Sequence, residues 1–600
     1  MRFGRISKAV GVAAVAALAL SACASTSSTP SSSSSASGAK QGGSATVVEV
    51  NGFSSFNANT AKGNVDINSK IAYATHSGFN YIDNNLNIVK NEKFGTYQKI
   101  SDDPLTVKYT INDGVKWSDG SPMDANDMIL SWAVDSGHYD DAKLDADGNV
   151  TAGTQYFQYA GDTSGLGLTD FPEIGDNGRS ITLKYSKPFA DWENSFGTEG
   201  VSPLDIPAHV VAQKAGLKDA AALTALLKSL PKGNPDAPVP ANPDLKKVAD
   251  FYNTGFDTKT MPTDTSLFLS NGPYVVKSLV PDQSMTLTRN KDYNWGPMPS
   301  LDEITVRYIS DSSAQIQALK NGEADIIAPQ ASADTVSQLQ ALSSQGVTMD
   351  KGAQLSYDHI DLNYSGPFKD KNVREAFMKI IPRTDIVNKI IKPLDPNAKP
   401  LDSQIFVPAQ AGYADSVKNN GSSNFQSVDI DGAKKLLNGA TPEVKIMYNK
   451  DNPNRLDAYT LIAQSAAKAG FKVVDGGLGK SEWGAALGSG TYDASIFGWI
   501  NSGVGVSGVP QIFKSGAASN FNKFSDPQAD QLMDQLITTT DKSKQVTLEQ
   551  QIDQKIWASD YGLPLFQSVG VDAYSDRVTG IKWMPNQTGV WWNFWEWSQK

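Results

Sequence analysis

The stretch VKWSDGSPMDANDMILSW, residues 115–132, carries the most specific local pattern of this chain. Just before it, LTVKYTI at 105–111 alternates apolar and polar residues, which predicts a strand. A turn at 112–114, with the sequence Asn-Asp-Gly, leads to a second predicted strand at 115–122. Asp124 is a suitable N-cap for a helix that runs to the end of the stretch. The pattern therefore predicts strand, turn, strand and helix, with no nucleophile and no metal cluster.

Helices and strands are also predicted to alternate elsewhere in the chain. Near its start, the alternating residues of 45–50 predict a strand that runs into a loop at 51–56. Further on, the order helix, strand, helix, strand is predicted for 428–437, 444–448, 456–470 and 471–474. This order is typical of a mixed or parallel sheet that is covered by helices.

Several stretches follow one another in the order that one protein family has them. Together they resemble the family 5 extracellular solute-binding proteins, the oligopeptide- and dipeptide-binding receptors of ATP-binding-cassette importers. The resemblance extends roughly from Ala45 to the C-terminus. Besides 115–132, the matching segments are NGPYVVK at 271–277, MTLTRNKDY at 285–293, LDEITVRYI at 301–309, the segment 315–327, Asn363, PFKDKNVREA at 367–376 and YDASIFGW at 492–499.

This resemblance implies an α/β fold, namely a two-lobed clamp of the type II periplasmic-binding-protein kind with an extra subdomain inserted in lobe one. By analogy, lobe one comprises 45–85, 195–330 and 556–600, the extra subdomain 86–194, and lobe two 331–555. Two crossings between the lobes, near 328–329 and 563–566, would form a hinge. The segment 215–262 looks like an insertion, with a helix predicted from Asp219 to Leu230.

The N-terminus has the pattern of a secreted lipoprotein. Residues 1–22 combine basic residues, a short apolar run and small residues, as a signal peptide does. Cys23, the only cysteine, follows in Leu-Ser-Ala-Cys, which resembles the lipobox whose cysteine receives lipid, palmitate included. Residues 23–44 would form a Ser-rich tether. We expect anchoring at the outer face of the cytoplasmic membrane; the alternative is an ordinary signal peptide with an incidental cysteine.

Composition and motifs argue against several other classes of protein. A net charge of −11 disfavours a nucleic-acid partner. Only four histidines occur, and none has the spacing of a zinc site, so we expect no metal and no cofactor. Gly477 to Ser481 lacks the upstream glycine of a P-loop, and 145–148 lacks the final glutamate of a calcium loop. No GxSxG motif is present, so we do not expect an enzyme.

Candidate ligand contacts come from segments that face the cleft in the resembled family. Aromatic side chains offer large, rigid surfaces to varied ligands. The aromatic cluster at 591–597 is instead expected to be structural, as a strand or a packed tail. The candidates are Phe53, Ser54, Tyr156, Gln158, Tyr159, Asn363, Trp499, Asn501 and Ser502.

The loop after Trp499 departs from the pattern of the peptide binders. In those relatives, an aspartate two or three residues after the tryptophan pairs with the α-ammonium of the ligand. This chain has Ile500, Asn501 and Ser502 there, and no carboxylate. A buried ammonium without a counter-charge is costly. Either another group holds the peptide, or the ligand lacks a free amino terminus.

The sequence therefore predicts a monomeric, lipid-anchored receptor that captures an oligopeptide or peptide-like solute, closes around it and delivers it to a membrane permease. Two alternatives remain open at this point. One is an envelope lipoprotein of the same fold that binds glycolipid or saccharide in an assembly role. The other is a secreted hydrolase, which would need two carboxylates about 5 Å apart in its cleft.

Overall fold

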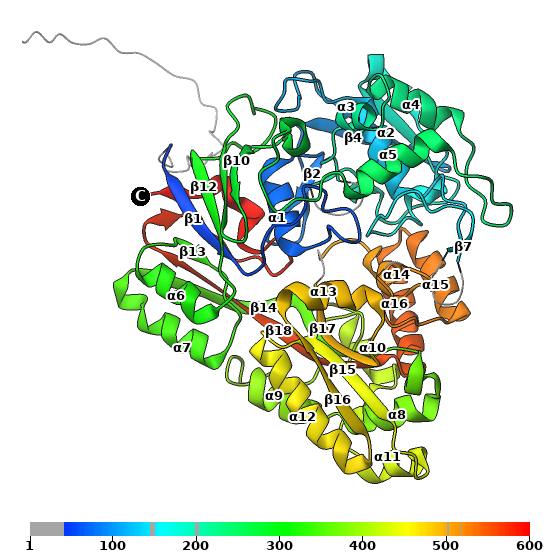
Figure 1. Cartoon of the computed structure of the whole chain (residues 1–600), viewed down its shortest axis with the longest axis vertical. Coiled ribbons are helices and arrows are strands. Elements are labelled where there is room, and N and C mark those ends of the chain that lie inside the picture. Colours follow the sequence, from blue (N-terminus) through cyan, green and yellow to red (C-terminus); the bar gives the residue numbers. More distant parts are fainter. Residues whose placement is uncertain (1–40, 145–149, 199–202, 501–502, 518) are drawn as a thin grey trace, which may run out of the picture. The chain divides into compact units, whose positions relative to one another are not determined.

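The framework of the structure is a ten-stranded mixed sheet, seen in the computed structural model of Figure 1. Residues 41–144, 150–198, 203–500, 503–517 and 519–600 are described. In spatial order, the strands are β10 (Tyr274–Val280), β11 (Ser284–Arg289), β12 (Glu303–Tyr308), β1 (Ser44–Glu49), β13 (Ile326–Ile327), β18 (Gly562–Ser575), β14 (Val347–Leu362), β17 (Ala494–Ile500), β15 (Glu443–Asn449) and β16 (Lys472–Leu478).

Parallel pairing is confined to two places in this sheet. Strand β1 runs parallel to both β12 and β13, and β15 runs parallel to both β16 and β17. Antiparallel pairs connect these two groups through β18 and β14. The prediction of a mixed sheet with βα units is thereby confirmed.

Strands β14 and β18 are long and lie side by side in the middle of the sheet. The first part of β14, from 347 to 353, pairs with 569–575 of β18, and the second part pairs with β17 as well. The register between β14 and β18 shifts between Ala353 and Tyr357 and again between Asp358 and His359. The hydrogen-bond ladder is therefore interrupted midway along both strands.

Many helices begin at a side chain that accepts from the first turn, a strong start signal. Asp124, Asp219 and Asn242 do this for α2, α4 and α5. The helices are α1 (Asp66–Thr75), α2 (Ala125–Asp135), α3 (Ala208–Lys214), α4 (Ala220–Ser229), α5 (Pro243–Thr254), α6 (Ser312–Lys320), α7 (Ala333–Ala341), α8 (Lys371–Lys379), α9 (Arg383–Ile390), α10 (Tyr413–Asn419), α11 (Ile430–Leu437), α12 (Pro453–Ala469), α13 (Lys480–Ser489), α14 (Gly508–Phe513), α15 (Pro527–Ile537) and α16 (Lys542–Ala558).

A second, antiparallel sheet contains the strand predicted at 105–111. Its order is β4 (Gly95–Asp102), β5 (Leu105–Ile111), β9 (Ser180–Lys184) and β8 (Glu173–Gly175). Strand β5 alternates buried and half-buried residues, as its sequence predicts. Short two-stranded pairs complete the described strands: β2 (Asn80–Ile82) with β3 (Ile88–Lys90), β6 (Lys143–Leu144) with β7 (Val150–Ala152), and β19 (Val578–Thr579) with β20 (Ser598–Gln599).

One local prediction was wrong, and for the aromatic cluster the structure decides between the two expected alternatives. The second strand expected at 115–122 is a tight loop, in which Trp117 N donates to Ser121 O at 2.8 Å. Gly120 has a φ of 91°, a conformation that suits glycine and bends the chain back. The aromatic cluster is not a strand but a 3₁₀ helix at Gly589–Glu596. Its packing role holds, because Trp591 and Trp597 are fully buried.

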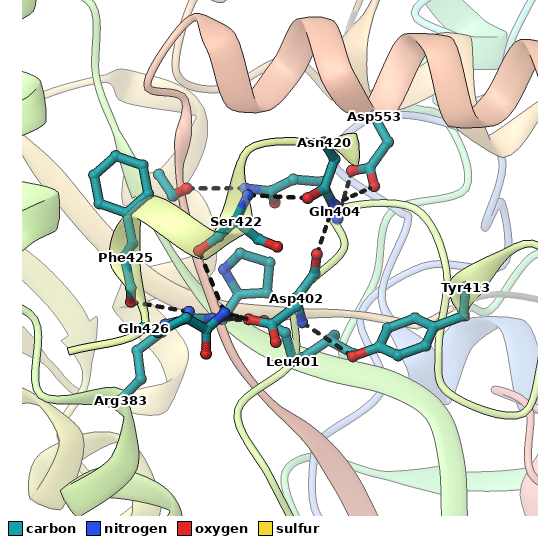
Figure 2. A network of polar contacts seen from close by, with 12 residues as sticks. Arg383, Leu401, Asp402, Gln404, Tyr413, Asn420, Ser422, Phe425, Gln426 and Asp553 are labelled. Carbon is teal, nitrogen blue, oxygen red and sulfur yellow. Dashed lines mark hydrogen bonds and ion pairs between the residues drawn. The ribbon is translucent and has the colours of Figure 1, made fainter. Parts of the chain in front are cut away.

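A buried polar network fixes the loop after α9 to α16 (Figure 2). The Asp553 carboxylate is fully buried and accepts hydrogen bonds from Ser403 Oγ, Gln404 N, Ser416 Oγ and Asn420 Nδ2, at 2.6–2.9 Å. A buried charge persists only where such donors compensate for lost water. Nearby, Arg383 pairs with Asp402 at 2.9 Å. These contacts hold long irregular segments in place around the sheet.

Candidate functional site

A cavity of about 220 Å³ lies between segments that are far apart in the sequence. The loop before α1 and α1 itself form one wall, with Asn59, Lys70 and Tyr73 among the lining residues. Residues 159–161, 198, 203 and 205, Gln511 of α14, and residues 587–588 form the rest. The volume is below the 300–1,000 Å³ typical of sites that enclose a drug-sized ligand. It therefore fits a small solute or one end of a longer one.

Backbone hydrogen bonds tie two of these walls together. Ala61 N donates to Gln158 O at 2.9 Å, and Ala160 N donates to Asn59 O at 2.8 Å. The loop before α1 is held in turn by Asn68, which accepts from Ser54 N at 3.0 Å and donates to Gly63 O at 2.9 Å. These bonds place Tyr159 and Asn59 on the cavity in a defined orientation.

Lys70 is the cationic residue of the lining. Its Nζ lies 2.7 Å from Glu49 Oε2 and 3.9 Å from Asp66 Oδ2. Burial alone would lower the pKa of Lys70, but the Glu49 and Asp66 carboxylates raise it above its ordinary value. Glu49 also accepts from Trp591 Nε1 at 2.7 Å. The charge of Lys70 is thus already compensated within the protein.

Asp205 is the acidic residue of the lining. Its side chain is 5 % exposed, and its Oδ1 accepts from Asn59 Nδ2 at 2.6 Å. Burial raises the pKa of Asp205 to about 7, although the hydrogen bond from Asn59 lowers it in part. No ion pair of Asp205 is found among the described residues.

The Asp191 carboxylate, which follows the second sheet in the sequence, binds the residues just before α14. Asp191, just before a 3₁₀ turn at Trp192–Asn194, accepts from Val506 N and Ser507 N, each at 2.8 Å, and from Ser507 Oγ at 2.6 Å. Close by, Gln511 Nε2 donates to Ala160 O at 2.9 Å. These bonds hold Gln511 and its neighbours against the wall that carries Tyr159.

The predicted ligand contacts from the first half of the chain have different surroundings in the structure. Tyr159 lines the cavity. Phe53 is buried beside Phe56, with ring centroids 4.7 Å apart, and Ser54 Oγ accepts from Asn68 Nδ2 at 3.0 Å. The Tyr156 hydroxyl accepts from Asn242 N at 2.7 Å, and the Gln158 side chain is exposed to solvent.

Of the predicted contacts from the second half of the chain, the two that the structure describes lie outside the lining. Asn363 is fully buried and donates to Gly490 O and Tyr492 O. Trp499 is half-buried on β17 and stacks on Phe521 at 5.8 Å between centroids. Asn501 and Ser502 fall outside the described residues, as does Cys23.

Sequence reasoning missed Asn59, Lys70, Asp205 and Gln511. One signal was present in the chain: Pro203-Leu-Asp-Ile-Pro207 places a carboxylate in an apolar run between two prolines. An acidic side chain in such a run either reaches solvent or is buried at a site where polar groups compensate for the lost water. The partner Asn59 is 146 positions away, so the pair itself was invisible in the sequence.

Comparison with known proteins now defines the class of protein. The protein-family model described as bacterial extracellular solute-binding proteins, family 5 Middle, matches residues 89–521. The chain therefore belongs to the family 5 extracellular solute-binding proteins, as its sequence resemblance indicated. The members of this family are binding proteins for solutes.

Relatives of this chain are found among mycobacterial proteins. The chain is 27% identical over 492 residues to the oligopeptide-binding protein OppA of Mycobacterium tuberculosis, covering 80% of this chain and 72% of that protein. It is 24% identical over 560 residues to an uncharacterized lipoprotein of the same organism, covering 90% and 91%.

Solved structures confirm the α/β fold of type II periplasmic binding proteins. The periplasmic EDTA-binding protein EppA has a TM-score of 0.75 at 22% identity, covering 94% of this chain and 97% of its own. The oligopeptide-binding protein AppA of Bacillus subtilis, in complex with a nonapeptide, has a TM-score of 0.73 at 19% identity, covering 94% and 100%.

Two features are absent from the described residues: a cluster of metal-ligating side chains and a helix suited to cross a membrane. In the parts of the chain that the structure describes, no group of three or more His, Cys, Asp or Glu side chains could hold a metal ion. In the same parts, none of the helices has the length and apolar character that crossing a membrane requires.

Proposed function

We propose that this protein is a lipid-anchored extracytoplasmic receptor of an ATP-binding-cassette importer, which captures an oligopeptide or peptide-like solute and delivers it to a permease. The observation that carries the proposal is the cavity. It is lined by the N-terminal loops, by 159–161 and by Gln511 of α14, so a solute inside contacts all three. The relatives named as oligopeptide-binding proteins favour a peptide as that solute.

Capture would proceed by closure of two lobes about a hinge. The lobe boundaries expected from the sequence (45–85, 195–330 and 556–600 for lobe one, 331–555 for lobe two) are retained in this proposal. The contacts of Asp191 with Val506 and Ser507 then join the extra subdomain, 86–194, to lobe two. Such contacts favour a closed state only if they are absent when the lobes are apart.

Tyr159 is the candidate ligand contact with the strongest support, because it lines the cavity. An aromatic face there offers area to many side chains at a small entropic cost. The other eight candidates remain part of the proposal as residues that surround the cleft. Lipid on Cys23 would hold the receptor, as a monomer, at the outer face of the cytoplasmic membrane.

Mass spectrometry of the solute that co-purifies with the protein tests this function. The protein would be extracted with detergent from its native membrane and denatured to release what it carries. We expect peptides, present at up to one molecule per protein. A glycolipid or saccharide at that stoichiometry would contradict the peptide proposal, and unchanged peptide uptake in cells lacking the protein would contradict the transport role.

A further inference from the structure

The cavity contains one acidic side chain for which no cationic partner is found among the described residues. Of its described lining residues, Lys70 and Asp205 are the ones that carry formal charge, and Lys70 is already paired with Glu49. Among the described residues, the side-chain donor to Asp205 is the amide of Asn59, which engages Oδ1. A buried carboxylate without a cation is costly, so the site is prepared for a partner that brings positive charge.

Among the described residues that line the two pockets bordering Asp205, no cation other than the paired Lys70 is present. His76 lines a small pocket on which Asp205 also borders, and burial lowers the pKa of His76 to about 4, so its ring is neutral. Tyr252, whose pKa is raised well above 10 by burial and by Asp205, stays neutral as well. Tyr73 and Tyr159, the other titratable residues of the described lining, are phenols.

We propose that Asp205 is the counter-charge for an ammonium group of the ligand, oriented by Asn59 and taking the role that the loop after Trp499 leaves without a carboxylate. This inference rests on the proposed peptide-binding function, and it names the chemistry of that same site. For a peptide, the ammonium is its amino terminus. The cavity of about 220 Å³ has room for the amino-terminal end of a peptide with short side chains.

The proposal also predicts how the affinity for the ligand depends on pH. Burial raises the pKa of Asp205 to about 7, so the free protein is largely protonated there below that pH. An ammonium binds the ionised form, and affinity should therefore fall about tenfold per pH unit below 7. Above pH 8 the amino terminus of a peptide loses its proton, since its usual pKa is about 7.7–8.0. Affinity should thus peak between about pH 7 and pH 8.

Capture of peptide pools by the full-length protein in detergent tests the proposal. One pool contains peptides of three to six residues without Lys or Arg, a second is the same pool N-acetylated, and a third is acetylated but carries one lysine. Wild-type protein is compared with Asp205→Asn, which is nearly isosteric and keeps an acceptor for Asn59. Asp292→Asn is the matched control, because it removes one exposed carboxylate outside the lining.

We expect wild type and Asp292→Asn to capture the free pool at least tenfold better than the acetylated pool, and Asp205→Asn to capture both equally. Recovery of binding in the lysine pool, dependent on Asp205, would support an ammonium from a side chain. A preference for the free pool that persists in Asp205→Asn, or no preference in wild type, would overturn the inference while leaving peptide binding intact. Failure to capture any pool would instead refute the proposed peptide function.

Discussion

Replacing Asp191 with alanine should weaken ligand binding about 100-fold without unfolding the protein. The carboxylate accepts three hydrogen bonds from Val506 and Ser507, all of 2.8 Å or less through Oδ2. Hydrogen bonds to a charged group contribute about 1.5–3 kcal/mol each, but three donors on one carboxylate do not add in full. We take about 3 kcal/mol for the set, which corresponds to roughly a 100-fold change in an equilibrium constant.

On the proposed hinge-closure mechanism, the effect appears as lost affinity because the bonds form only in the closed state. When the lobes are apart, water satisfies both the carboxylate and the donors, so the mutation costs the open state little. A smaller population of the competent closed state lowers the apparent affinity in proportion. Isothermal titration calorimetry with the solute that co-purifies with the protein measures this directly.

Two variants control the Asp191→Ala experiment. Ser507→Ala removes one of the three donors and should weaken binding tenfold or less. Asp113→Ala removes a carboxylate of the same subdomain that is 96% exposed, and its ion pair with Arg179 should contribute less than about 1 kcal/mol. If Asp191→Ala binds within threefold of wild type, while all three variants unfold at similar temperatures, the contact does not control closure.

Further outcomes are expected from other parts of the chain. Cys23→Ala should release the protein from membranes, as fractionation and the intact mass would show; unchanged fractionation and mass would contradict lipidation. Asp553→Ala leaves four donors unpaired in the network of Figure 2 and should destabilise the protein by about 3 kcal/mol or more. Its thermal midpoint should therefore be lower than that of the control Asp541→Ala, which removes only a helix cap. Burial raises the folded-state pKa of Asp205 to about 7, so its contribution to the free energy of unfolding should fall by about 2–3 kcal/mol between pH 5 and pH 8. Asp205→Asn should lack this decrease. Thermal midpoints of wild type and Asp205→Asn that depend on pH in the same way would contradict the prediction. Small-angle scattering of the Lys40–Lys600 unit should show a smaller radius of gyration with ligand, and tight binding without compaction would count against a clamp.

Elements whose signals are local were predictable from the sequence. The period of two in β5 and the cap at Asp124 both appear in the structure, the latter with Asp127 completing a capping box. The helix and strand order from α11 to β16 is also confirmed, because each apolar pattern there is long enough to fix its element.

The misses have identifiable physical reasons. Helix α5 was not predicted, although Asn242-Pro243 is a strong start signal. The 3₁₀ conformation of the Trp591 cluster could not be predicted, because packing partners such as Glu49 lie more than 500 positions away. Asp205 was missed for the same reason: its burial and its partner depend on contacts that no local pattern records.

The position of β18 has a consequence for how the protein is made. This strand comes from residues 562–575, yet it lies between β13 and β14 in the middle of the ten-stranded sheet. During synthesis from the N-terminus, strands already made on either side cannot be joined until this late segment emerges. Until then both groups present unpaired edges that invite association with other chains. Folding of this protein therefore depends on protecting a half-built sheet while the residues between Leu362 and Gly562 are being made.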